Sequence, residues 1–420
     1  MQRRTSRLAT IGALAAATTL ALTACGSGFS DTGDANGGGA SGELTSSDDA
    51  LSVLIGSSGD AETQAVTDAV ASWSADSGTD AEVSVASDLP QQLSQGFASG
   101  QPADVFYVST DTLAGFAGNG SLLAYGDRLS NKDDFFPTLV QSFTIDDQFY
   151  CAPKDFSTLG LVINTQMWDD AGLTDADIPT DWDSLTTAAA ALTTDDHVGL
   201  AFSPEFARVG AFMAQAGGAL TNADGTEATV DSPENEEALT YVKELLTSGD
   251  AAFSSDLGAG WGGEAFGTGQ AAMTIEGNWI AGAMTNDYPD VDYRIAELPA
   301  GPAGQGTLQF TNCWGIAADS PNQEAAVALV EQLTSTDQQL AFADAFGVMP
   351  SIQSAADQWK TDNPDDAAFL DSADFAQGVP NQDGSAAVIA DFNSQLSGLA
   401  TADPATILES AQANLEAILG

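Results

Sequence analysis

Short apolar strands alternate with helical segments early in the chain, and this alternation is the strongest constraint on the fold. Residues 51–55, LSVLI, are a continuous apolar run of strand length, and the turn GSSGD separates them from residues 62–74, whose apolar positions follow helical spacing. Residues 82–86 and 103–108 predict two further strands, with a glutamine-rich helical segment between them. The pattern favours an α/β fold on a mainly parallel sheet with helices on both faces.

The chain is long enough for two lobes. About 375 residues follow position 46, which is too many for one ordinary hydrophobic core and suits two. The sequence contains 42 glycines and 15 prolines, which divide it into short elements. No stretch beyond the N-terminus is long and apolar enough to cross a bilayer.

The N-terminus has the composition of an export signal. Three arginines within the first seven residues precede an apolar stretch over residues 11–22, and LTAC closes the segment at Cys25. This ending resembles a bacterial lipobox, which implies that residues 1–25 are a lipoprotein signal and that Cys25 is lipidated. Residues 26–46 are mostly Gly, Ser, Asp and Thr, and we expect them to form a flexible tether.

The charge is strongly negative. Without the three signal arginines, 7 basic residues face 60 acidic ones, a formal net charge of −53. Such a surface disfavours nucleic acid, anionic lipid and phosphorylated ligands as partners. It also makes any single pair of carboxylates a weak indication of acid–base catalysis, because carboxylates occur throughout the chain.

Two cysteines remain once Cys25 is assigned to the lipid. Cys151 and Cys313 belong to an exported chain, where oxidation is permitted, and we predict that they form a disulfide. Two free buried thiols are the alternative.

Residues 269–284, GQAAMTIEGNWIAGAM, carry the most specific motif. A strand-length apolar run ends at Gly277 and a helix restarts after Trp279, so the indole lies at the carboxyl end of a strand, where sites on α/β folds are built. A core aromatic is the alternative role of Trp279. The segment resembles the "GkaAM…GxW" signature of carbohydrate-binding solute-binding proteins of ABC transporters. The resemblance implies that Trp279 stacks on a sugar ring.

Further landmarks of this family follow in the same order. Residues 150–164 resemble the first crossover between lobes, residues 307–317 the second and residues 346–351 the third. The resemblance, closest to the actinobacterial maltose or maltooligosaccharide branch, implies a two-lobe periplasmic-binding-protein-like fold of type II with three interlobe crossovers. The implied N-terminal lobe comprises residues 47–153 and 308–348, and the C-terminal lobe comprises residues 154–307 and 349–420. The two cysteines would then meet at the hinge.

The same resemblance implies a set of ligand-binding residues in an interlobe cleft. Three carboxylates would accept hydrogen bonds from sugar hydroxyls, and further tryptophans would stack beside Trp279; the implied residues are Asp60, Asp111, Glu205, Trp261 and Trp314. Asp60 and Asp111 could instead cap helices. Arg208 departs from the family pattern; we expect it among the ligand-binding residues as well, where it could pair with Glu205. Lys154, at the first crossover, is either an ion-pair partner of Asp155 or a donor in the cleft.

Enzyme motifs are missing from the sequence. His197 is the single histidine, and neither a G-x-S-x-G elbow nor a phosphate-binding GxxxxGK[ST] motif occurs. A glycosidase using two carboxylates and a receptor for another solute class stay open as alternatives. The expected function is a lipid-anchored, monomeric, extracellular receptor that passes a neutral oligosaccharide to an ABC permease, without cofactor, metal or nucleic acid.

Overall fold

The computed structural model describes residues 42–420. Cys25, the proposed signal and most of the proposed tether lie outside the described residues. Thr45, near the end of the range expected to be a tether, donates its backbone N–H to Gln323 and its hydroxyl to the carbonyl of Ser320. Contacts with the folded body therefore begin before residue 47.

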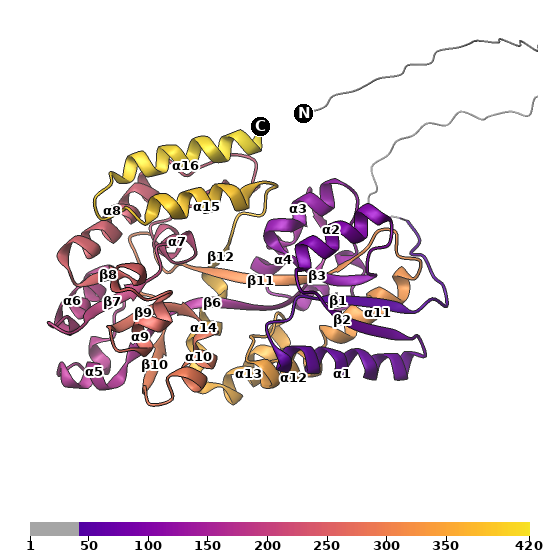
Figure 1. The fold of residues 1–420 in the computed structure, drawn as a ribbon, viewed down its shortest axis with the longest axis horizontal. Helices are drawn as coiled ribbons and strands as arrows, with labels where there is room; N and C mark the ends of the chain where they lie inside the picture. Colours follow the sequence, from indigo (N-terminus) through magenta and orange to yellow (C-terminus); the bar gives the residue numbers. More distant parts are fainter. Residues whose placement is uncertain (1–41) are drawn as a thin grey trace, which may run out of the picture. The chain divides into compact units, whose positions relative to one another are not determined.

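Ten strands form one mixed sheet (Figure 1). Eight of them follow the order β2-β1-β3-β11-β6-β9-β7-β8, while β10 pairs with β6 and β12 with β11 outside this order. Their bounds are β1 Leu51–Ile55, β2 Ala81–Val85, β3 Val105–Ser109, β6 Ala152–Asn164, β7 Val198–Phe202, β8 Ala251–Phe253, β9 Ala271–Gly277, β10 Tyr293–Ala296, β11 Thr307–Ile316 and β12 Ala376–Gly378. A separate hairpin pairs β4 Thr144–Ile145 with β5 Gln148–Phe149.

Helices follow most strands, as the alternation predicted. Before β6 these are α1 Asp60–Ser77, α2 Leu89–Ser99, α3 Thr110–Gly118 and α4 Pro137–Ser142. Between β6 and β11 they are α5 Thr165–Asp170, α6 Trp182–Leu192, α7 Phe206–Gln215, α8 Pro233–Ser248, α9 Gly262–Gly267 and α10 Ile280–Asp287. After β11 they are α11 Gln323–Leu333, α12 Thr336–Phe346, α13 Ala356–Asp362, α14 Ala367–Asp371, α15 Ser385–Leu396 and α16 Pro404–Leu419. None of the helices within residues 42–420 has the length and apolarity that crossing a bilayer requires.

The expected parallel pairing holds in the two outer groups of strands. β2, β1 and β3 are parallel to one another, and so are β9, β7 and β8. The central pairs, β3 with β11, β11 with β6 and β6 with β9, are antiparallel. The reason is that β6 carries the chain from the first group to the second, and β11 carries it back.

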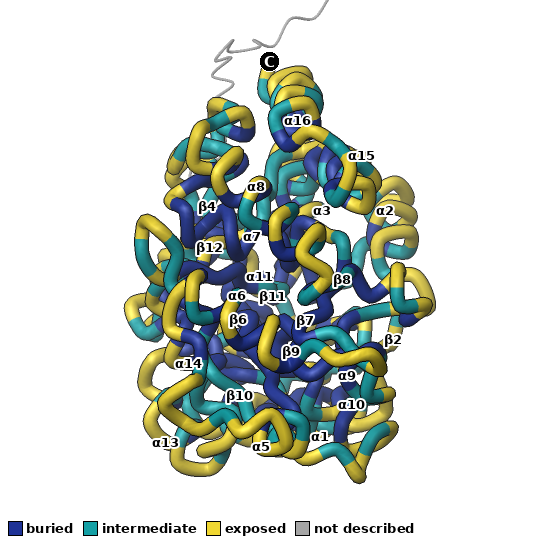
Figure 2. The backbone as a smooth tube through the Cα atoms, turned by 90° about the vertical axis from the view of Figure 1, so that its left-hand side faces the viewer, coloured by how far each residue is buried: buried dark blue, intermediate teal, exposed yellow. Residues whose placement is uncertain are grey.

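The two largest hydrophobic cores within residues 42–420 lie on either side of these crossing strands, and two smaller clusters supplement them. The first is built from residues 51–152 and 313–355, and the second from residues 159–308 and 388–415. The expected two-lobe organisation is thus present, while the exact lobe boundaries stay a prediction. Figure 2 shows the backbone of β6 and β9 buried in the interior, in agreement with the almost continuous burial of both strands.

A buried charge cluster ties the first crossing strand to α1. The Lys154 ammonium lies 3.1 Å from Oε1 of Glu62 and also contacts Asp155, while the Tyr107 hydroxyl donates to Glu62 at 2.9 Å. The other Glu62 oxygen accepts from the backbone N–H and the hydroxyl of Ser58, both at 2.7 Å. Of the two roles considered for Lys154, the structure shows the ion pair with Asp155. Glu62 is a second partner of the Lys154 ammonium.

These partners decide the ionisation of the cluster. Burial by itself raises the pKa of Glu62, but the Lys154 charge and the Ser58 hydrogen bonds outweigh it, and the net shift is downward. Burial likewise disfavours the charged form of Lys154, but the carboxylates of Asp155 and Glu62 raise its pKa overall. The turn after β1 is therefore held by an ionised carboxylate.

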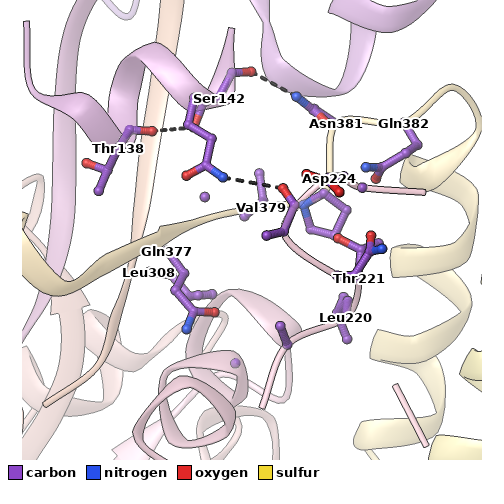
Figure 3. Close-up of a pocket in the computed structure, with 18 of the residues that line it drawn as sticks. Thr138, Ser142, Leu220, Thr221, Asp224, Leu308, Gln377, Val379, Asn381 and Gln382 are labelled. Atoms are coloured by element: carbon purple, nitrogen blue, oxygen red, sulfur yellow. Dashed lines mark hydrogen bonds between the residues drawn. The ribbon is translucent and has the colours of Figure 1, made fainter. Parts of the chain in front are cut away.

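Two pockets border the crossing strand β11. The larger has a volume of about 810 Å³ and lies among α4, α7, the loop over residues 218–226 and the segment over residues 376–382 (Figure 3). The smaller, of about 350 Å³, is lined by residues at the ends of β1, β3 and β9 and by the crossing strands. Val379 lines both.

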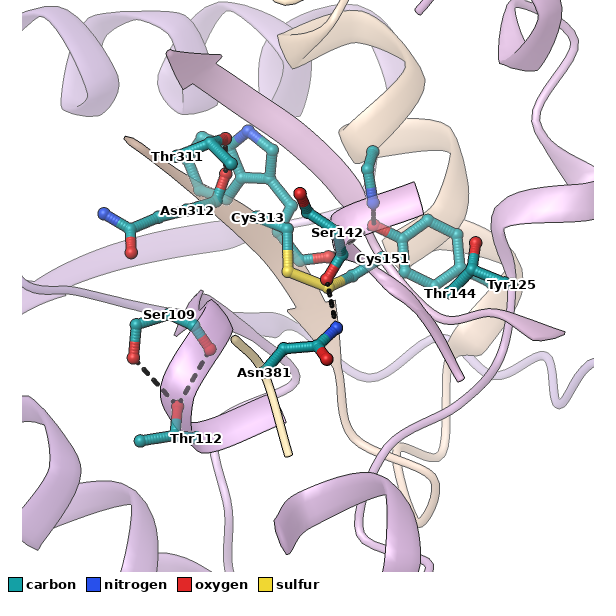
Figure 4. The surroundings of a disulfide bond; sticks show 12 residues. Ser109, Thr112, Tyr125, Ser142, Thr144, Cys151, Thr311, Asn312, Cys313 and Asn381 are labelled. Atoms are coloured by element: carbon teal, nitrogen blue, oxygen red, sulfur yellow. Dashed lines mark hydrogen bonds between the residues drawn. A yellow bond between two sulfur atoms is a disulfide. The ribbon is translucent and has the colours of Figure 1, made fainter. Parts of the chain in front are cut away.

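The predicted disulfide between Cys151 and Cys313 is present (Figure 4). Both residues are fully buried, their Cα atoms are 5.6 Å apart, and the bond joins the start of β6 to β11. Tyr125 lies beside it; its hydroxyl donates to the carbonyl of Trp314 and accepts from the backbone N–H of Ala152. The bond therefore fastens the two crossing strands where they enter the first core.

Replacing both cysteines by serine should lower the free energy of unfolding by about 2–5 kcal/mol, because the cross-link spans 162 positions and restricts the unfolded chain. Denaturant unfolding of the oxidised protein and of the Cys151→Ser, Cys313→Ser variant measures the difference. The wild type in reductant serves as the control. Equal stability of variant and oxidised protein would contradict a stabilising bridge.

Glu62→Gln should lower the free energy of unfolding at neutral pH by on the order of 3 kcal/mol, the lower end for a broken buried ion pair, since Asp155 still faces Lys154. The pKa of Glu62 is lowered in the folded protein, so its stabilising contribution is present above the unfolded value of 4.5 and is lost as the pH falls through the folded pKa. The gap between wild type and variant should therefore shrink in acid. A gap that stays constant with pH would contradict this.

Candidate functional site

The smaller pocket gathers segments from distant parts of the chain. Ser58 comes from the turn after β1, Ser109 and Thr110 from the end of β3, and Asn278 and Trp279 from the end of β9. Strands β6 and β11 and residues 346–348 complete the lining. The carboxyl ends of parallel strands from both outer groups thus meet at one pocket, which is the usual place for a site in this class of fold.

Trp279 is the exposed aromatic of this pocket. It is the residue before α10 and lies two positions after the end of the buried strand β9, as the sequence pattern predicted. Trp279 is 39% exposed, so its indole is available to a ligand and the residue does not belong to the core. Its ring lies over Gly277, where an added Cβ would come within 2.3 Å of the indole, so this position requires glycine.

Three contacts fix the orientation of the Trp279 ring. The indole N–H donates to Oε2 of Glu276 at 3.0 Å, and the Arg208 guanidinium carbon lies 5.4 Å from the ring centroid. The ring also meets Phe310 of β11 edge to face, with centroids 5.6 Å apart. The indole is thus held in one position before any ligand arrives.

Glu276 and Arg208 form a buried ion pair below this ring. Nη2 of Arg208 donates to Oε2 of Glu276 at 2.5 Å, with Glu276 fully buried and Arg208 only 9% exposed. Burial raises the pKa of Glu276, although the Arg208 charge and the hydrogen bonds from Arg208 and Trp279 oppose the shift. The same Glu276 oxygen therefore serves both the cation and the aromatic ring.

Glu205 also belongs to this group. It is the N-cap residue of α7, its side chain is about half exposed, and Oε2 lies 3.6 Å from Nη1 of Arg208. The predicted pairing of Arg208 with Glu205 is present, but the closer partner is Glu276. Glu205 keeps an exposed carboxylate near Trp279.

The structure places Asp60 and Asp111 beside the smaller pocket rather than in its lining. Both are exposed, and the lining residues are their neighbours Ser58, Ser109 and Thr110. The alternative that they cap helices is wrong, because the N-caps of α1 and α3 are Gly59 and Ser109. Asp60 is two positions from Ser58 and Asp111 is one position from Thr110, and both of these neighbours line the pocket.

The other two tryptophans are placed differently. Trp261 is half-buried, precedes α9 and covers Gly263, and it lines neither pocket. Trp314 is 1% exposed and packs edge to face on Tyr107 in the first core, with centroids 4.8 Å apart. Its ring has no exposed face for stacking in this structure, since β11 turns it toward the core.

Glu276 and Phe310 were not among the predicted site residues. Glu276 is the one acidic residue in the apolar run AAMTIEG, and a buried carboxylate in such a strand needs a partner. That signal was visible in the sequence. Phe310 carried no comparable signal, because its role depends on β11 passing beside Trp279.

The smaller pocket has an uncharged lining. Hydroxyl groups, amides and aromatic rings dominate its lining, and none of its lining residues is charged. His197 lies elsewhere and contacts the Thr194 hydroxyl at 3.0 Å. Within residues 42–420 no group of three His, Cys, Asp or Glu side chains is arranged to hold a metal ion.

Known proteins resemble this chain in sequence or in fold. A Brucella abortus protein named as a "putative binding protein" is 25% identical over 351 residues, which span 79% of this chain and 83% of that protein. The cyclic α-maltosyl-1,6-maltose binding protein of Arthrobacter globiformis superposes with a TM-score of 0.78 at 22% identity, over 88% of this chain and 98% of that chain. The GacH receptor of Streptomyces glaucescens, solved unliganded and with acarbose, gives a TM-score of 0.75 at 21% identity over the same shares.

The family model of bacterial extracellular solute-binding proteins matches residues 68–369, well over half of the chain. That range contains both crossing strands, the disulfide and the Glu276, Arg208 and Trp279 group. The protein belongs to the family of bacterial extracellular solute-binding proteins.

Proposed function

We propose that this protein is the solute receptor of an ABC importer and that it binds a neutral oligosaccharide of the maltose or maltooligosaccharide type in the smaller pocket. The observation that carries the proposal is Trp279, an exposed indole held by Glu276, Arg208 and Phe310 at the wall of that pocket. The apolar face of a pyranose ring packs on such an indole, while its hydroxyls bond to surrounding polar groups.

The polar groups around Trp279 suit an uncharged ligand. Ser58, Ser109, Thr110 and Asn278 offer hydroxyls and an amide within the lining. We propose that Glu205, Asp60 and Asp111 accept further hydroxyl hydrogen bonds when the two lobes close on the sugar. Two of the structural neighbours are described as binding a cyclic maltosyl-maltose and acarbose, which supports this ligand class.

Closure would proceed at the crossing strands. A ligand that contacts residues from both cores binds the closed form more tightly than the open one, and it shifts the population by that difference in affinity. The closed monomer would be recognised by the permease. We further propose that lipidation at Cys25 holds the receptor at the extracellular face of the membrane, and that the protein is a receptor without enzymatic activity.

Calorimetric titration of a chain lacking residues 1–25 with maltose, maltotriose, raffinose and xylotriose tests the proposal, with the same samples assayed for sugar cleavage. We expect one-to-one binding of a maltooligosaccharide without cleavage. Trp279→Ala should weaken that binding at least thirtyfold, about 2 kcal/mol or more, because the stacking face is lost. Trp261→Ala is the matched control and should bind normally. Cleavage would favour a glycosidase, and no binding would refute the ligand class.

Glu276→Gln should weaken oligosaccharide binding by about tenfold, since the indole N–H and Arg208 both lose a charged acceptor, an interaction of about 1.5–3 kcal/mol. Tryptophan emission should shift as the Trp279 ring becomes mobile. Glu264→Gln is the control, because that carboxylate bonds the Gly260 amide instead. Wild-type affinity in Glu276→Gln would show that the buried pair does not orient the indole.

A further inference from the structure

The larger pocket lies on a different face of α7 from Trp279. Glu205 and Arg208 point from α7 toward the Glu276 and Trp279 group. Phe206, Gly210 and Met213, at helical spacing on the other side, line the larger pocket. The two pockets therefore share α7 and Val379 as walls but present different side chains.

The walls of this pocket come from segments before and after β6, the first crossing strand, in the sequence. Thr138, Gln141 and Ser142 of α4 precede β6, whereas α7 and the loop over residues 218–226 follow it (Figure 3). Two hydrogen bonds link the sides: Gln141 Nε2 donates to the carbonyl of Ala223 at 3.5 Å, and Asn381 Nδ2 donates to the carbonyl of Ser142 at 3.0 Å.

Its walls hold hydrogen-bond acceptors that lack donors. Thr138 Oγ1 and Gln382 Oε1, both in lining residues, are buried without a hydrogen-bond partner among residues 42–420. Oε1 of Gln309 also lacks a partner, but this side chain is 1% exposed and is not part of the lining; its amide nitrogen donates to the Thr138 carbonyl and to the Ser142 hydroxyl. A buried acceptor without a donor costs about 1–3 kcal/mol, so this wall favours a ligand that brings hydroxyl or N–H donors.

The charges around the pocket narrow the ligand class. Its lining includes no Lys or Arg, and its charged members are the exposed side chains of Asp146, Asp147 and Asp224. An anion would be repelled by these carboxylates and by the net charge of the chain. Val379 is a partly exposed apolar residue of the lining, whereas Phe206 and Leu308, 6% and 1% exposed, belong mainly to the second core.

We propose that the larger pocket is a second binding site, for a small neutral polyhydroxylated compound such as a monosaccharide or disaccharide. Its volume of about 810 Å³ falls within the usual range for small-molecule sites. The site does not depend on Trp279, so it stands apart from the proposed receptor function. Because Val379 and α7 are common walls, occupancy of one pocket is linked to affinity at the other, and the effect is reciprocal.

The test uses the Trp279→Ala protein, in which the smaller pocket is impaired, with glucose and trehalose as probes. Saturation-transfer NMR and titration should detect saturable millimolar binding of at least one probe. Adding Ala223→Trp, which places an indole in the exposed loop of the larger pocket, should abolish it. Ala413→Trp, on an exposed position of α16, is the matched control and should leave it unchanged.

A second variant tests the role of the unpartnered acceptors and leaves the volume of the larger pocket nearly unchanged. Thr138→Val combined with Gln382→Leu, again in the Trp279→Ala protein, should weaken probe binding at least tenfold while circular dichroism shows an intact fold. Absence of saturable binding in the Trp279→Ala protein would overturn the proposal, as would binding unaffected by Ala223→Trp. If the wild type failed to bind maltooligosaccharides but the probes still bound, only the ligand proposed for the receptor would be refuted.

Discussion

The antiparallel pairing of β6 with β11 is the interaction on which the rest of the structure depends. These two strands carry the chain between the cores, and their residues contribute to both. The disulfide joins them at one end, and the Lys154 cluster ties β6 to α1. Because Phe156 and Phe310 of the same strands line the smaller pocket, any rotation of one core against the other changes the shape of that pocket.

Two of the few basic residues are buried beside the candidate site. Only 7 basic residues follow the signal arginines, and two of them, Lys154 and Arg208, are buried in ion pairs next to the smaller pocket. Burying a charge is costly unless a partner compensates, so these pairs persist only with good geometry. Their effect is positional: Glu62 holds the Ser58 turn, and Glu276 holds the Trp279 ring. The exposed carboxylates elsewhere need no such partners.

Much of the local structure could be predicted. The run over residues 51–55 is β1, the strand-turn-helix around Trp279 is as expected, and the paired cysteines are bonded. Errors of one residue occurred where several polar residues compete for a helix start, as with Asp60 and Gly59. Trp279 was the leading stacking candidate and Trp314 a further one, and the burial of Trp314 could not be predicted, because exposure depends on which face of a strand or turn meets a core formed by other segments.

The identity and order of the elements follow from spacing patterns among neighbouring residues, and these patterns are present in any unfolded copy of the chain. The site does not follow from them. Arg208 reaches Glu276 across 68 positions, and Gln141 meets Ala223 across 82. Such contacts exist only once the crossing strands have brought the segments together, since a side chain's burial, partners and pKa depend on what packs against it. Local sequence thus decided the strands and helices, and tertiary packing decided which side chains face the two pockets.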